Sequence, residues 1–380
     1  MRAATLSKRC WWALKSRWRV RSDVRRVGLV GFGSIAEHGH LPALLSFEGV
    51  DVVAVADPSA ERLARAAELL PEAALYRMST ELIAGADIDT LDICSPPRTH
   101  ADLIVDACVR GIESIISEKP FVLTNEEYIQ VSTARQASGS RVVSVNNWLH
   151  SDLYRHVATV LRSGEIGTVQ RLALSTERTR AALGHTGWAP HWRTDLAEAG
   201  GGIVLDHGWH QLYLLLGWAA APLQAIRADM RTNDRRNLPV EDEATLNLCF
   251  PNARGQIDLS WTAGQRGNSG EIIGTMGRID IHDDRIVVRC GAGSRELPFS
   301  GRLTQSSYHP DWFRLMFRYN VLDPNRAEAD RNFTEAGVLV SAITAAYRSA
   351  RDGGTMQRLA AWASGTETDD VRNRDRSVTA

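Results

Sequence analysis

A glycine-rich turn at residues 31–36 (GFGSIA) has the residue types that bind a pyrophosphate. Gly31 permits a tight turn, Gly33 lets the main chain come close to phosphate groups, and Ala36 keeps the next helix close to the sheet. The N-terminus of that helix offers backbone N–H groups and positive dipole charge to the anion. The residues expected to contact a bound dinucleotide here are Gly31, Phe32, Gly33, Ser34 and Ile35.

An acidic residue, Asp57, ends the second apolar run, residues 52–56. This is about the distance from the turn at which a carboxylate accepts hydrogen bonds from both hydroxyls of the adenosine ribose. A phosphate on that ribose would be repelled, so we expect NAD in preference to NADP, although Arg62 could weaken this preference. An ordinary strand-to-helix turn could carry the same glycines, but the apolar run 27–30 before them and Asp57 after them favour a cofactor site.

The elements around this turn alternate between strand and helix up to about residue 146, which predicts a doubly wound parallel sheet. The expected strands are 91–94, 113–116 and 142–145, and the expected helices are 99–110 and 125–137. Ligands bind such sheets beyond the carboxyl ends of the strands. The residues at these ends, expected on the cofactor side, are Ser95, Pro96, Glu118 and Lys119. We expect His100, in the first turn of its helix, to form a structural or a cofactor-side hydrogen bond.

The second half of the chain has a different pattern. After a helix at 153–163, several strands follow that are joined mostly through Gly, Asn, Asp or Pro, which favours a mostly antiparallel sheet. The expected strands are 170–176, 223–230, 244–250, 255–261, 271–275 and 279–282. A helix at about 327–351 has apolar residues at core-facing spacing and closes the fold. The polar tail beyond Gly353 is expected to fray.

The composition of the 380-residue chain fits two folded domains, with 44% hydrophobic residues to fill their cores. The net charge of −1 implies no nucleic acid or other polyanionic partner. We expect a basic extension at 1–24, a nucleotide-binding domain at 25–146, a substrate and oligomerisation domain at 147–353, and a tail at 354–380. No segment has 18 uninterrupted apolar residues, so we expect no membrane span.

The N-terminal extension is basic and contains three tryptophans, Trp11, Trp12 and Trp18. It lacks the apolar run of a secretory signal, and Arg25-Arg26 leads directly into the first strand, which argues against a twin-arginine signal. It could be a flexible segment, a result of an upstream start codon, or a contact for a membrane surface or partner. Five scattered cysteines without CxxC spacing are typical of a reducing cytoplasm, where we expect the protein. They are Cys10, Cys94, Cys108, Cys249 and Cys290.

Several short motifs occur together in one order. They are GFGSIA at 31–36 with HLPAL at 40–44, PPRTH at 96–100, EKP at 118–120, GEIG at 164–167, GGG at 200–202 followed by Asp206 and His210, and GTMG at 274–277. Each motif is common, but the full order resembles the glucose-fructose oxidoreductase and inositol dehydrogenase family (Gfo/Idh/MocA). The resemblance covers roughly residues 25 to 353.

This resemblance implies an α/β protein. Its N-terminal Rossmann domain would be followed by a C-terminal α/β domain with a large, mostly antiparallel open sheet. In that family the open sheet often forms the oligomer interface, so we expect a homodimer or homotetramer. The active site would lie between the domains. Lys119 matches the lysine of the family's Glu-Lys-Pro motif, and Asp206 and His210 match the aspartate and histidine of its second-domain motif.

The chemistry of these three residues fits hydride transfer from an alcohol. A histidine that titrates near neutrality can accept the alcohol proton and return it, so His210 is the candidate acid/base. Lys119 would stabilise alkoxide character, and Asp206 would balance the lysine or orient substrate hydroxyls. The glycines before Asp206 would let the segment pass close to cofactor and substrate. The alternatives are that Asp206 caps a helix, that His210 is a core histidine, and that Lys119 is a surface charge.

One position departs from the family. Family members often carry an acidic residue three positions after the histidine, where this chain has Tyr213, which could donate a hydrogen bond to substrate or only pack. Nearby aromatic and basic residues could stack on a sugar or cyclitol ring, or could serve ordinary packing. They are Trp188, Trp192, Arg193 and Trp209. The pairs His38/His40 and His207/His210 lack convincing further ligands, so we expect no metal.

The function expected from these observations is an NAD(P)-dependent oxidoreductase that acts on a secondary alcohol or ketone of a sugar, cyclitol or related polyol. One alternative is a family member that uses bound NAD transiently, as in glycosidase or epimerase-like branches, without net redox. Another is a nucleotide-sensing regulator that keeps the fold and has lost turnover. The joint presence of Lys119, Asp206 and His210 argues against the regulator.

Overall fold

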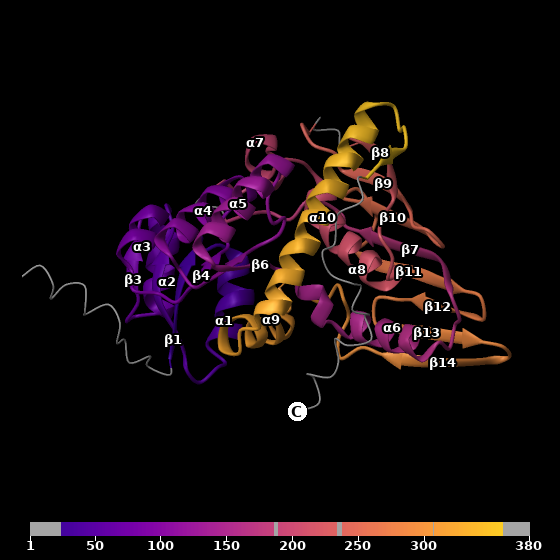
Figure 1. The fold of residues 1–380 in the computed structure, drawn as a ribbon, viewed down its shortest axis with the longest axis horizontal. Helices are drawn as coiled ribbons and strands as arrows, with labels where there is room; N and C mark the ends of the chain where they lie inside the picture. Colours follow the sequence, from indigo (N-terminus) through magenta and orange to yellow (C-terminus); the bar gives the residue numbers. More distant parts are fainter. Residues whose placement is uncertain (1–23, 186–188, 234–237, 307, 360–380) are drawn as a thin grey trace, which may run out of the picture.

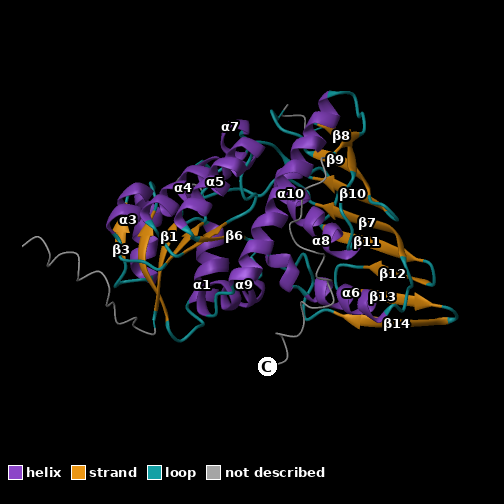
Figure 2. Ribbon diagram, in the orientation of Figure 1, coloured by secondary structure: helices purple, strands orange, loops and turns teal. Residues whose placement is uncertain are grey.

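The computed structural model describes residues 24–185, 189–233, 238–306 and 308–359. Most of the predicted N-terminal extension, most of the predicted tail, and Trp188 lie outside these residues. Two sheets with their covering helices form the two ends of the molecule, and a long helix, α10 (Arg326–Arg351), lies between them (Figures 1 and 2). Among the described residues, none of the helices combines the length and the apolar character needed to cross a bilayer.

The first sheet is parallel and has the strand order β3-β2-β1-β4-β5-β6, which confirms the predicted doubly wound topology. Every residue of β4 and β5 is buried, as expected for a parallel sheet that is covered on both faces. The strands are β1 (Arg25–Val30), β2 (Val50–Ala56), β3 (Ala74–Tyr76), β4 (Thr90–Ile93), β5 (Ser114–Ser117) and β6 (Arg141–Ser144).

The helices of the first domain begin and end at local signals. Gly111 ends α4 in the left-handed conformation with φ +77°, as the sequence predicts, and Thr124 and Glu127 form a reciprocal capping box at the start of α5. These elements are η1 (Ala36–His40), α1 (Leu41–Leu44), α2 (Ala60–Leu69), α3 (Ser79–Gly85), η2 (Pro97–Thr99), α4 (His100–Arg110) and α5 (Asn125–Ser138).

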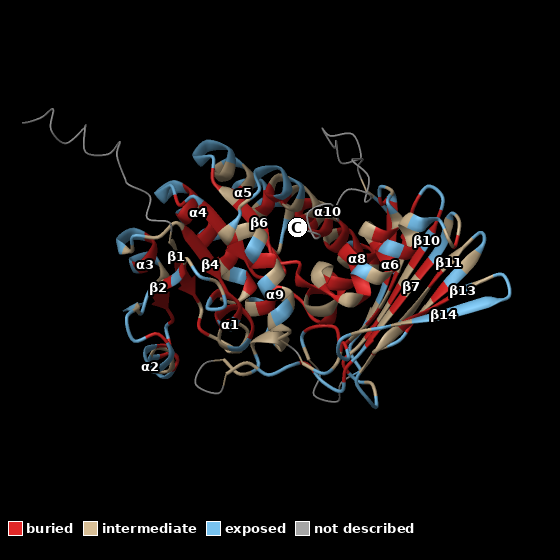
Figure 3. Ribbon diagram, turned by 90° about the horizontal axis from the view of Figure 1, so that it is seen from below, coloured by how far each residue is buried: buried red, intermediate tan, exposed pale blue. Residues whose placement is uncertain are grey.

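The second sheet has the order β14-β13-β12-β11-β7-β10-β9-β8-β15 and is antiparallel except between β7 and β10, which confirms the predicted mostly antiparallel sheet. Buried and less buried residues alternate along its strands (Figure 3). The strands are β7 (Val169–Glu177), β8 (Ala225–Arg231), β9 (Glu243–Cys249), β10 (Arg254–Ser260), β11 (Gly267–Gly274), β12 (Gly277–Ile281), β13 (Arg285–Cys290), β14 (Gly293–Pro298) and β15 (Gln357–Arg358).

Helices pack against one face of this sheet and supply the residues that approach the first domain. Besides α10 they are α6 (Asp152–Ser163), η5 (Val204–Gly208) and α8 (Trp209–Ala219). Of the other helical elements, α7 (Leu196–Ala199) lies against η2, α9 (Pro310–Phe317) against α1 and η1, and η6 (Arg318–Leu322) against β5. The short η3 (Asn147–His150) contacts α6, α8 and α9, and η4 (Trp192–Thr194) precedes α7. The alternation of buried residues along β9 places Ala244, Leu246 and Leu248 on the inner face. The opposite face carries polar and charged side chains.

Several elements differ from the sequence prediction, among them β3 and α3 of the first domain, which were not predicted. β13, β14 and α9 were not predicted, and β14 is exposed along most of its length, so its polar sequence gives no periodic apolar signal. The tail does not fray immediately after Gly353, because β15 pairs antiparallel with β8 through Gln357 and Arg358. A two-residue strand is too short to be recognised from sequence.

The C-terminal helices return to the first domain. Phe313 of α9 packs against His40 with 4.4 Å between ring centroids. On α10, Phe333 packs on the ring of Phe121, and Asn332 exchanges two hydrogen bonds with the main chain of Ser144 in β6. The C-terminal half of α10 lies against β8. This helix therefore fixes the two sheets relative to each other.

Candidate active site between the two domains

The glycine turn follows β1. It is closely packed against protein at Gly31 and open at Gly33. Gly31 has φ +85°, and a Cβ atom there would lie 2.6 Å from the backbone nitrogen of Ser95, so only glycine fits. A Cβ atom on Gly33 would instead meet nothing within 4 Å. The main chain at Gly33 is thus open to a ligand that approaches closely, which is the space a pyrophosphate requires.

Asp57, at the end of β2, braces this turn. Its Oδ2 accepts a hydrogen bond from the Phe32 N–H at 2.7 Å, and its Oδ1 accepts one from the Ser59 N–H at 2.8 Å. Each carboxylate oxygen keeps a lone pair that could accept from a ribose hydroxyl. Arg62 donates to the Phe32 carbonyl at 2.6 Å and forms an ion pair with Glu37. Because its guanidinium is already bonded to Glu37, which also pairs with Arg65, Arg62 is less available to a ribose phosphate.

Ser95, Pro96 and His100 lie where β4 ends. Ser95 and Pro96 are half-buried, and the Ser95 hydroxyl is 2.7 Å from that of Thr99. His100 is fully buried, with Nε2 2.9 Å from the Ser95 carbonyl oxygen and Nδ1 2.9 Å from that of Pro120. Both ring nitrogens therefore face main-chain carbonyls. His100 therefore links the loop after β4 to the loop after β5. Of the structural and the cofactor-side hydrogen bonds expected for it, these are structural.

Glu118 belongs to a buried row of charges rather than to an open ligand surface. Its Oε1 accepts from His40 Nε2 at 3.0 Å, and its Oε2 accepts from the Lys119 backbone N–H at 2.9 Å. His40 Nδ1 lies 2.9 Å from Asp92 Oδ2. Burial alone would lower the pKa of His40, but Asp92 outweighs this effect and holds the pKa well above its ordinary value. The Glu118 side chain thus helps to hold the lysine loop, and its contact with a cofactor stays a prediction.

Cys94 lies against the same imidazole, with Sγ 3.2 Å from His40 Nδ1. His40, Asp92 and Cys94 are ligand types that bind transition metals. A thiol must lose its proton to bind a metal, yet burial raises the pKa of Cys94 to about 12. The 2.9 Å and 3.2 Å separations are those of hydrogen bonds. We therefore interpret this group as a hydrogen-bonded network, and the absence of a metal site stays a prediction.

Lys119 and Asp206 meet across the domain boundary. The Lys119 Nζ lies 2.6 Å from Asp206 Oδ1 and donates to the Asp206 carbonyl oxygen at 2.9 Å. Burial would raise the pKa of Asp206, but Lys119, with smaller contributions from His207 and Arg193, holds it well below its ordinary value. Asp206 does not cap η5, whose N-cap residue is Ile203. The structure therefore joins one residue from each half of the chain in an ion pair.

His210 stands in the first turn of α8, close to this pair. Its side chain is buried and stacks on Trp148 with 5.7 Å between ring centroids. Burial lowers the pKa of His210 well below its ordinary value, and the positive charge of Lys119 lowers it further. The imidazole is therefore neutral near pH 7 and can accept a proton.

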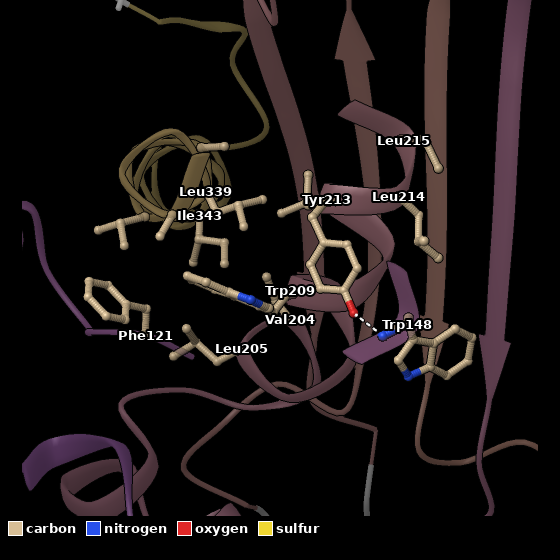
Figure 4. Close-up of a cluster of buried hydrophobic side chains, with 14 of the residues drawn as sticks. Phe121, Trp148, Val204, Leu205, Trp209, Tyr213, Leu214, Leu215, Leu339 and Ile343 are labelled. Atoms are coloured by element: carbon tan, nitrogen blue, oxygen red, sulfur yellow. Dashed lines mark hydrogen bonds between the residues drawn. The ribbon is translucent and has the colours of Figure 1, made fainter. Parts of the chain in front are cut away.

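Tyr213 is 4% exposed, and its hydroxyl bonds to protein groups. Its hydroxyl oxygen lies 2.9 Å from His210 Nδ1 and accepts a hydrogen bond from the Trp148 N–H at 3.1 Å (Figure 4). Two roles were expected for this tyrosine, a hydrogen bond to substrate or packing alone. Its burial agrees better with packing, and its hydrogen bond to His210 was not predicted.

The tryptophans expected at a sugar ring have different surroundings. Trp209 is fully buried, donates from Nε1 to Asn146 Oδ1 at 3.1 Å, and packs near Leu339 and Ile343 of α10 (Figure 4). It is a core residue, so the stacking interpretation is wrong for this side chain. Trp192 is half-buried and stacks on the Arg193 guanidinium at 4.3 Å. Trp188 lies outside the described residues.

Arg193 brings its loop to the site, because its Nε lies 3.9 Å from Asp206 Oδ1. The aromatic residues near His210 were missed by the sequence analysis. Trp148 contacts Trp312 of α9 edge to face at 5.3 Å, and Trp312 stacks on His309 at 3.7 Å. No motif identifies these residues, because they come from separate segments that only the folded chain brings together.

The three glycines before Asp206 allow close packing against protein. A Cβ atom on Gly202 would overlap with the Glu241 carbonyl oxygen, and one on Gly201 would overlap with the Tyr347 hydroxyl. The Glu241 carboxylate accepts hydrogen bonds from the Gly202 N–H at 3.0 Å and the Val204 N–H at 3.1 Å. The expected approach of these glycines to cofactor and substrate is replaced by a rigid mount for the aspartate segment.

Two family models match the chain. One is described as an oxidoreductase family with an NAD-binding Rossmann fold and matches residues 25–147. The other is the GFO/IDH/MocA C-terminal domain and matches residues 154–280. The first match confirms the expected cofactor class for the first domain. The two matches together cover the first sheet and the second sheet from β7 to β12.

Named relatives are similar over part of their length. Inositol 2-dehydrogenase 4 of Saccharopolyspora erythraea is 32% identical over 143 residues, which are 37% of this chain and 42% of that protein. The dTDP-3,4-didehydro-2,6-dideoxy-alpha-D-glucose 3-reductase of Streptomyces antibioticus is 28% identical over 221 residues, 58% of this chain and 65% of that protein. The matched stretches span about half the length of these curated relatives.

The fold is similar to that of the WlbA dehydrogenase from Bordetella pertussis, which was solved in complex with NADH and UDP-GlcNAcA. The TM-score is 0.74 at 22% sequence identity, and the match covers 89% of this chain and 98% of that chain.

Proposed function

Because the chain belongs to the GFO/IDH/MocA oxidoreductase family, we propose that it is an NAD-dependent dehydrogenase or reductase acting on a CH–OH group or the corresponding ketone. The observation that carries this proposal is the 2.6 Å contact between Lys119 and Asp206, two charges that both act on the pKa of His210. A charged donor, a carboxylate and a neutral imidazole meet there at the mouth of a dinucleotide-binding domain. This set of groups suits proton transfer coupled to hydride transfer.

The residues that would hold the cofactor fit a dinucleotide. The open main chain at Gly33 would receive the pyrophosphate, and Asp57 would accept from the ribose hydroxyls. When bound, NAD supplies the hydride acceptor or donor at its nicotinamide ring. The neutralised Arg62 supports NAD over NADP.

The residues of the site divide the remaining work. In oxidation, His210 Nε2 accepts the proton of the substrate hydroxyl, and in reduction it returns that proton to the oxygen. Lys119, fixed by Asp206, donates a hydrogen bond to the same oxygen and stabilises its negative charge. Asp206 holds the lysine ammonium in place.

We propose a sugar, cyclitol or related polyol as the substrate class. The names of an inositol dehydrogenase and a deoxysugar reductase among the relatives support a secondary alcohol or ketone on a ring. Trp148 and Trp312 are the aromatic residues nearest to His210 that could pack on the apolar face of such a ring.

We propose a homodimer or homotetramer formed through the open face of the second sheet. This face carries alternating charged and polar side chains, among them Arg227, Asp229, Thr245 and Asp258. Such a surface can form reciprocal ion pairs across a twofold axis.

The proposed function is tested by thermal-shift titration with NAD and NADP, followed by absorbance assays of NADH formation over a panel of sugars and inositols. The wild type is compared with His210→Ala. Substrate-dependent NADH formation that is lost in the variant supports a net dehydrogenase. Conversion of substrate without NADH would show transient use of the cofactor instead. NAD binding without any turnover would favour a nucleotide-sensing regulator.

A further inference from the structure

We propose that Tyr213 is the positioning residue of His210: its hydroxyl fixes the imidazole from the Nδ1 side while adding no negative charge there. This inference rests on the proposed function, because it assigns His210 the role of acid/base. Position 213 is the one at which members of the Gfo/Idh/MocA family often carry an acidic residue.

The geometry holds the imidazole on two sides. The Tyr213 Oη lies 2.9 Å from Nδ1, and the indole ring of Trp148 stacks on the imidazole with an angle of 29° between the rings. The backbone N–H of the same tryptophan donates to Tyr213 Oη at 3.1 Å and thereby fixes the hydroxyl (Figure 4). Among the described residues, none forms a hydrogen bond with Nε2 of His210. Nε2 is therefore the nitrogen left for a substrate.

The hydrogen bonds around Tyr213 determine where the imidazole carries its proton. The hydroxyl oxygen already accepts from the Trp148 N–H, and the hydroxyl hydrogen has His210 Nδ1 as its acceptor in a buried place. A buried donor without an acceptor is costly, so the resting imidazole accepts at Nδ1 and carries its proton on Nε2. This form offers Nε2–H as a hydrogen-bond donor to a substrate carbonyl oxygen.

The other tautomer keeps a hydrogen bond to the same hydroxyl but removes the acceptor of the hydroxyl hydrogen, so it is the less stable form at rest. For alcohol oxidation the ring proton must lie on Nδ1, from which it is donated to the second lone pair of Tyr213 Oη. Nε2 then takes the proton of the substrate hydroxyl while the hydride goes to the nicotinamide, which leaves an imidazolium. In reduction that imidazolium gives the Nε2 proton to the new alkoxide. A carboxylate in place of the hydroxyl could only accept from Nδ1–H and would favour the protonated ring.

The charges around His210 make the missing carboxylate important. Lys119, from the loop after β5, and Arg178, at the end of β7, both lower the pKa of the imidazole, as does His207. Asp206 raises it but is paired with Lys119. The negative charge of Glu118 adds to the effect of burial in raising the pKa of the Tyr213 hydroxyl. An aspartate at position 213 would add a negative charge beside Nδ1 and raise the pKa of His210.

A purely structural role for the tyrosine is the alternative, because the hydrogen bond from Trp148 to Tyr213 also anchors η3 on α8. A matched control separates the two roles. Tyr128 is another buried tyrosine, whose hydroxyl donates to the Phe333 carbonyl oxygen at 3.2 Å in the first domain. Tyr128→Phe therefore removes a similar hydrogen bond far from the imidazole.

The experiment compares Tyr213→Phe, Tyr213→Asp and Tyr128→Phe with the wild type, on the full-length protein with NAD and the substrate found in the panel. We expect Tyr213→Phe to lower kcat by about 10- to 100-fold with KM nearly unchanged, since the acid/base loses its alignment. Tyr213→Asp should move the acidic limb of kcat/KM in oxidation upward by about one pH unit. The proposal is overturned if Tyr213→Phe retains the kcat and pH profile of Tyr128→Phe, or if the limb of a folded Tyr213→Asp does not move.

A second measurement is independent of turnover and of the stability of the aspartate variant. The ¹⁵N shifts of the His210 ring, assigned by comparison with His210→Ala, report which nitrogen carries the proton. In the wild type near pH 7 we expect the proton on Nε2 and a hydrogen-bonded Nδ1, and we expect Tyr213→Phe to lose that preference. A wild-type ring with its proton on Nδ1, or a pattern unchanged in Tyr213→Phe, contradicts the proposal even if the dehydrogenase function itself fails.

Discussion

His210 lies among positively charged groups, and this determines the pH at which it can act as a base. Burial, Lys119 and His207 together place its pKa well below the ordinary value of 6.5. The neutral form accepts the alcohol proton, and this form persists until the pH falls below the lowered pKa. Activity in the oxidation direction should therefore continue below pH 6.5 before it declines.

The pH profile of kcat/KM in the oxidation direction measures this directly, because it reports the ionisation of the free enzyme. We expect the acidic limb to lie below pH 6.5. An acidic limb above pH 6.5 that disappears only when His210 is substituted would contradict this prediction, because it would show that the imidazole is stabilised in its protonated form.

We expect the preference for NAD over NADP to depend on Asp57 and on the ion pair between Arg62 and Glu37. Asp57→Ser should shift the ratio of kcat/KM values toward NADP, because it removes the carboxylate that would repel a ribose phosphate. Adding Glu37→Gln should shift the ratio further, since Arg62 then loses its ion-pair partner. Glu68→Gln, which removes an exposed partner of Arg65 and leaves the Glu37 ion pairs in place, is the control. If the ratio of kcat/KM values is unchanged in the double variant, Asp57 does not contact the ribose.

At the scale of elements, the two glycine segments should respond differently to an added methyl group. Gly33→Ala places its Cβ in open space, whereas Gly202→Ala forces a Cβ into the carbonyl group of Glu241. We expect Gly33→Ala to unfold near the wild-type temperature and to bind NAD at least about 10-fold more weakly. Gly202→Ala should lose about 2 kcal/mol or more of stability.

Thermal unfolding and NAD titration of both variants check this contrast. If Gly33→Ala binds NAD like the wild type, the pyrophosphate does not approach this turn. If Gly202→Ala is as stable as the wild type, the packing of the aspartate segment against Glu241 is looser than the contacts indicate.

The row Asp92–His40–Glu118 ties η1 to the ends of β4 and β5, and its contribution should depend on pH. His40 has a raised pKa in the folded state, so the folded protein holds this proton more tightly than the unfolded chain. The resulting stabilisation is complete below about pH 6.5 and is lost as the pH rises through the raised pKa. His40→Gln should thus cost about 3 kcal/mol at about pH 6, because it leaves two buried carboxylates without their cation, and less in alkaline solution.

Urea unfolding of wild type and His40→Gln across this pH range provides the measurement, with the exposed His282→Gln as the control. A destabilisation by His40→Gln that does not shrink as the pH rises would mean that His40 is neutral in the folded protein.

Sequence patterns identified the elements with strong local signals. The apolar strands, the glycine at 111 and the long helix near 327–351 were predicted because periodicity and capping act within a few residues. The row around His40 could not be predicted, since its members are 52 and 78 residues apart from it. Trp209 was assigned to substrate because it lies next to His210 in the sequence, whereas α8 turns its side chain into the core.

At the scale of the whole molecule, the site exists because two sheets are held at one relative position. α10 bonds to β6 through Asn332 and lies along β8, while Trp209 of α8 bonds to Asn146 after β6. α9 adds Trp312 to the aromatic group and packs Phe313 on His40. From the sequence we predicted a domain boundary after residue 146. A single boundary of this kind does not reveal that residues 310–337 return to the first sheet.

The most direct test of the account is the turnover of His210→Ala measured together with its Kd for NAD. If groups from both domains form one active site, kcat should fall by about 10²- to 10⁴-fold while the Kd for NAD stays within about twofold of the wild type. NADH formation by His210→Ala at the wild-type rate would contradict the proposed site.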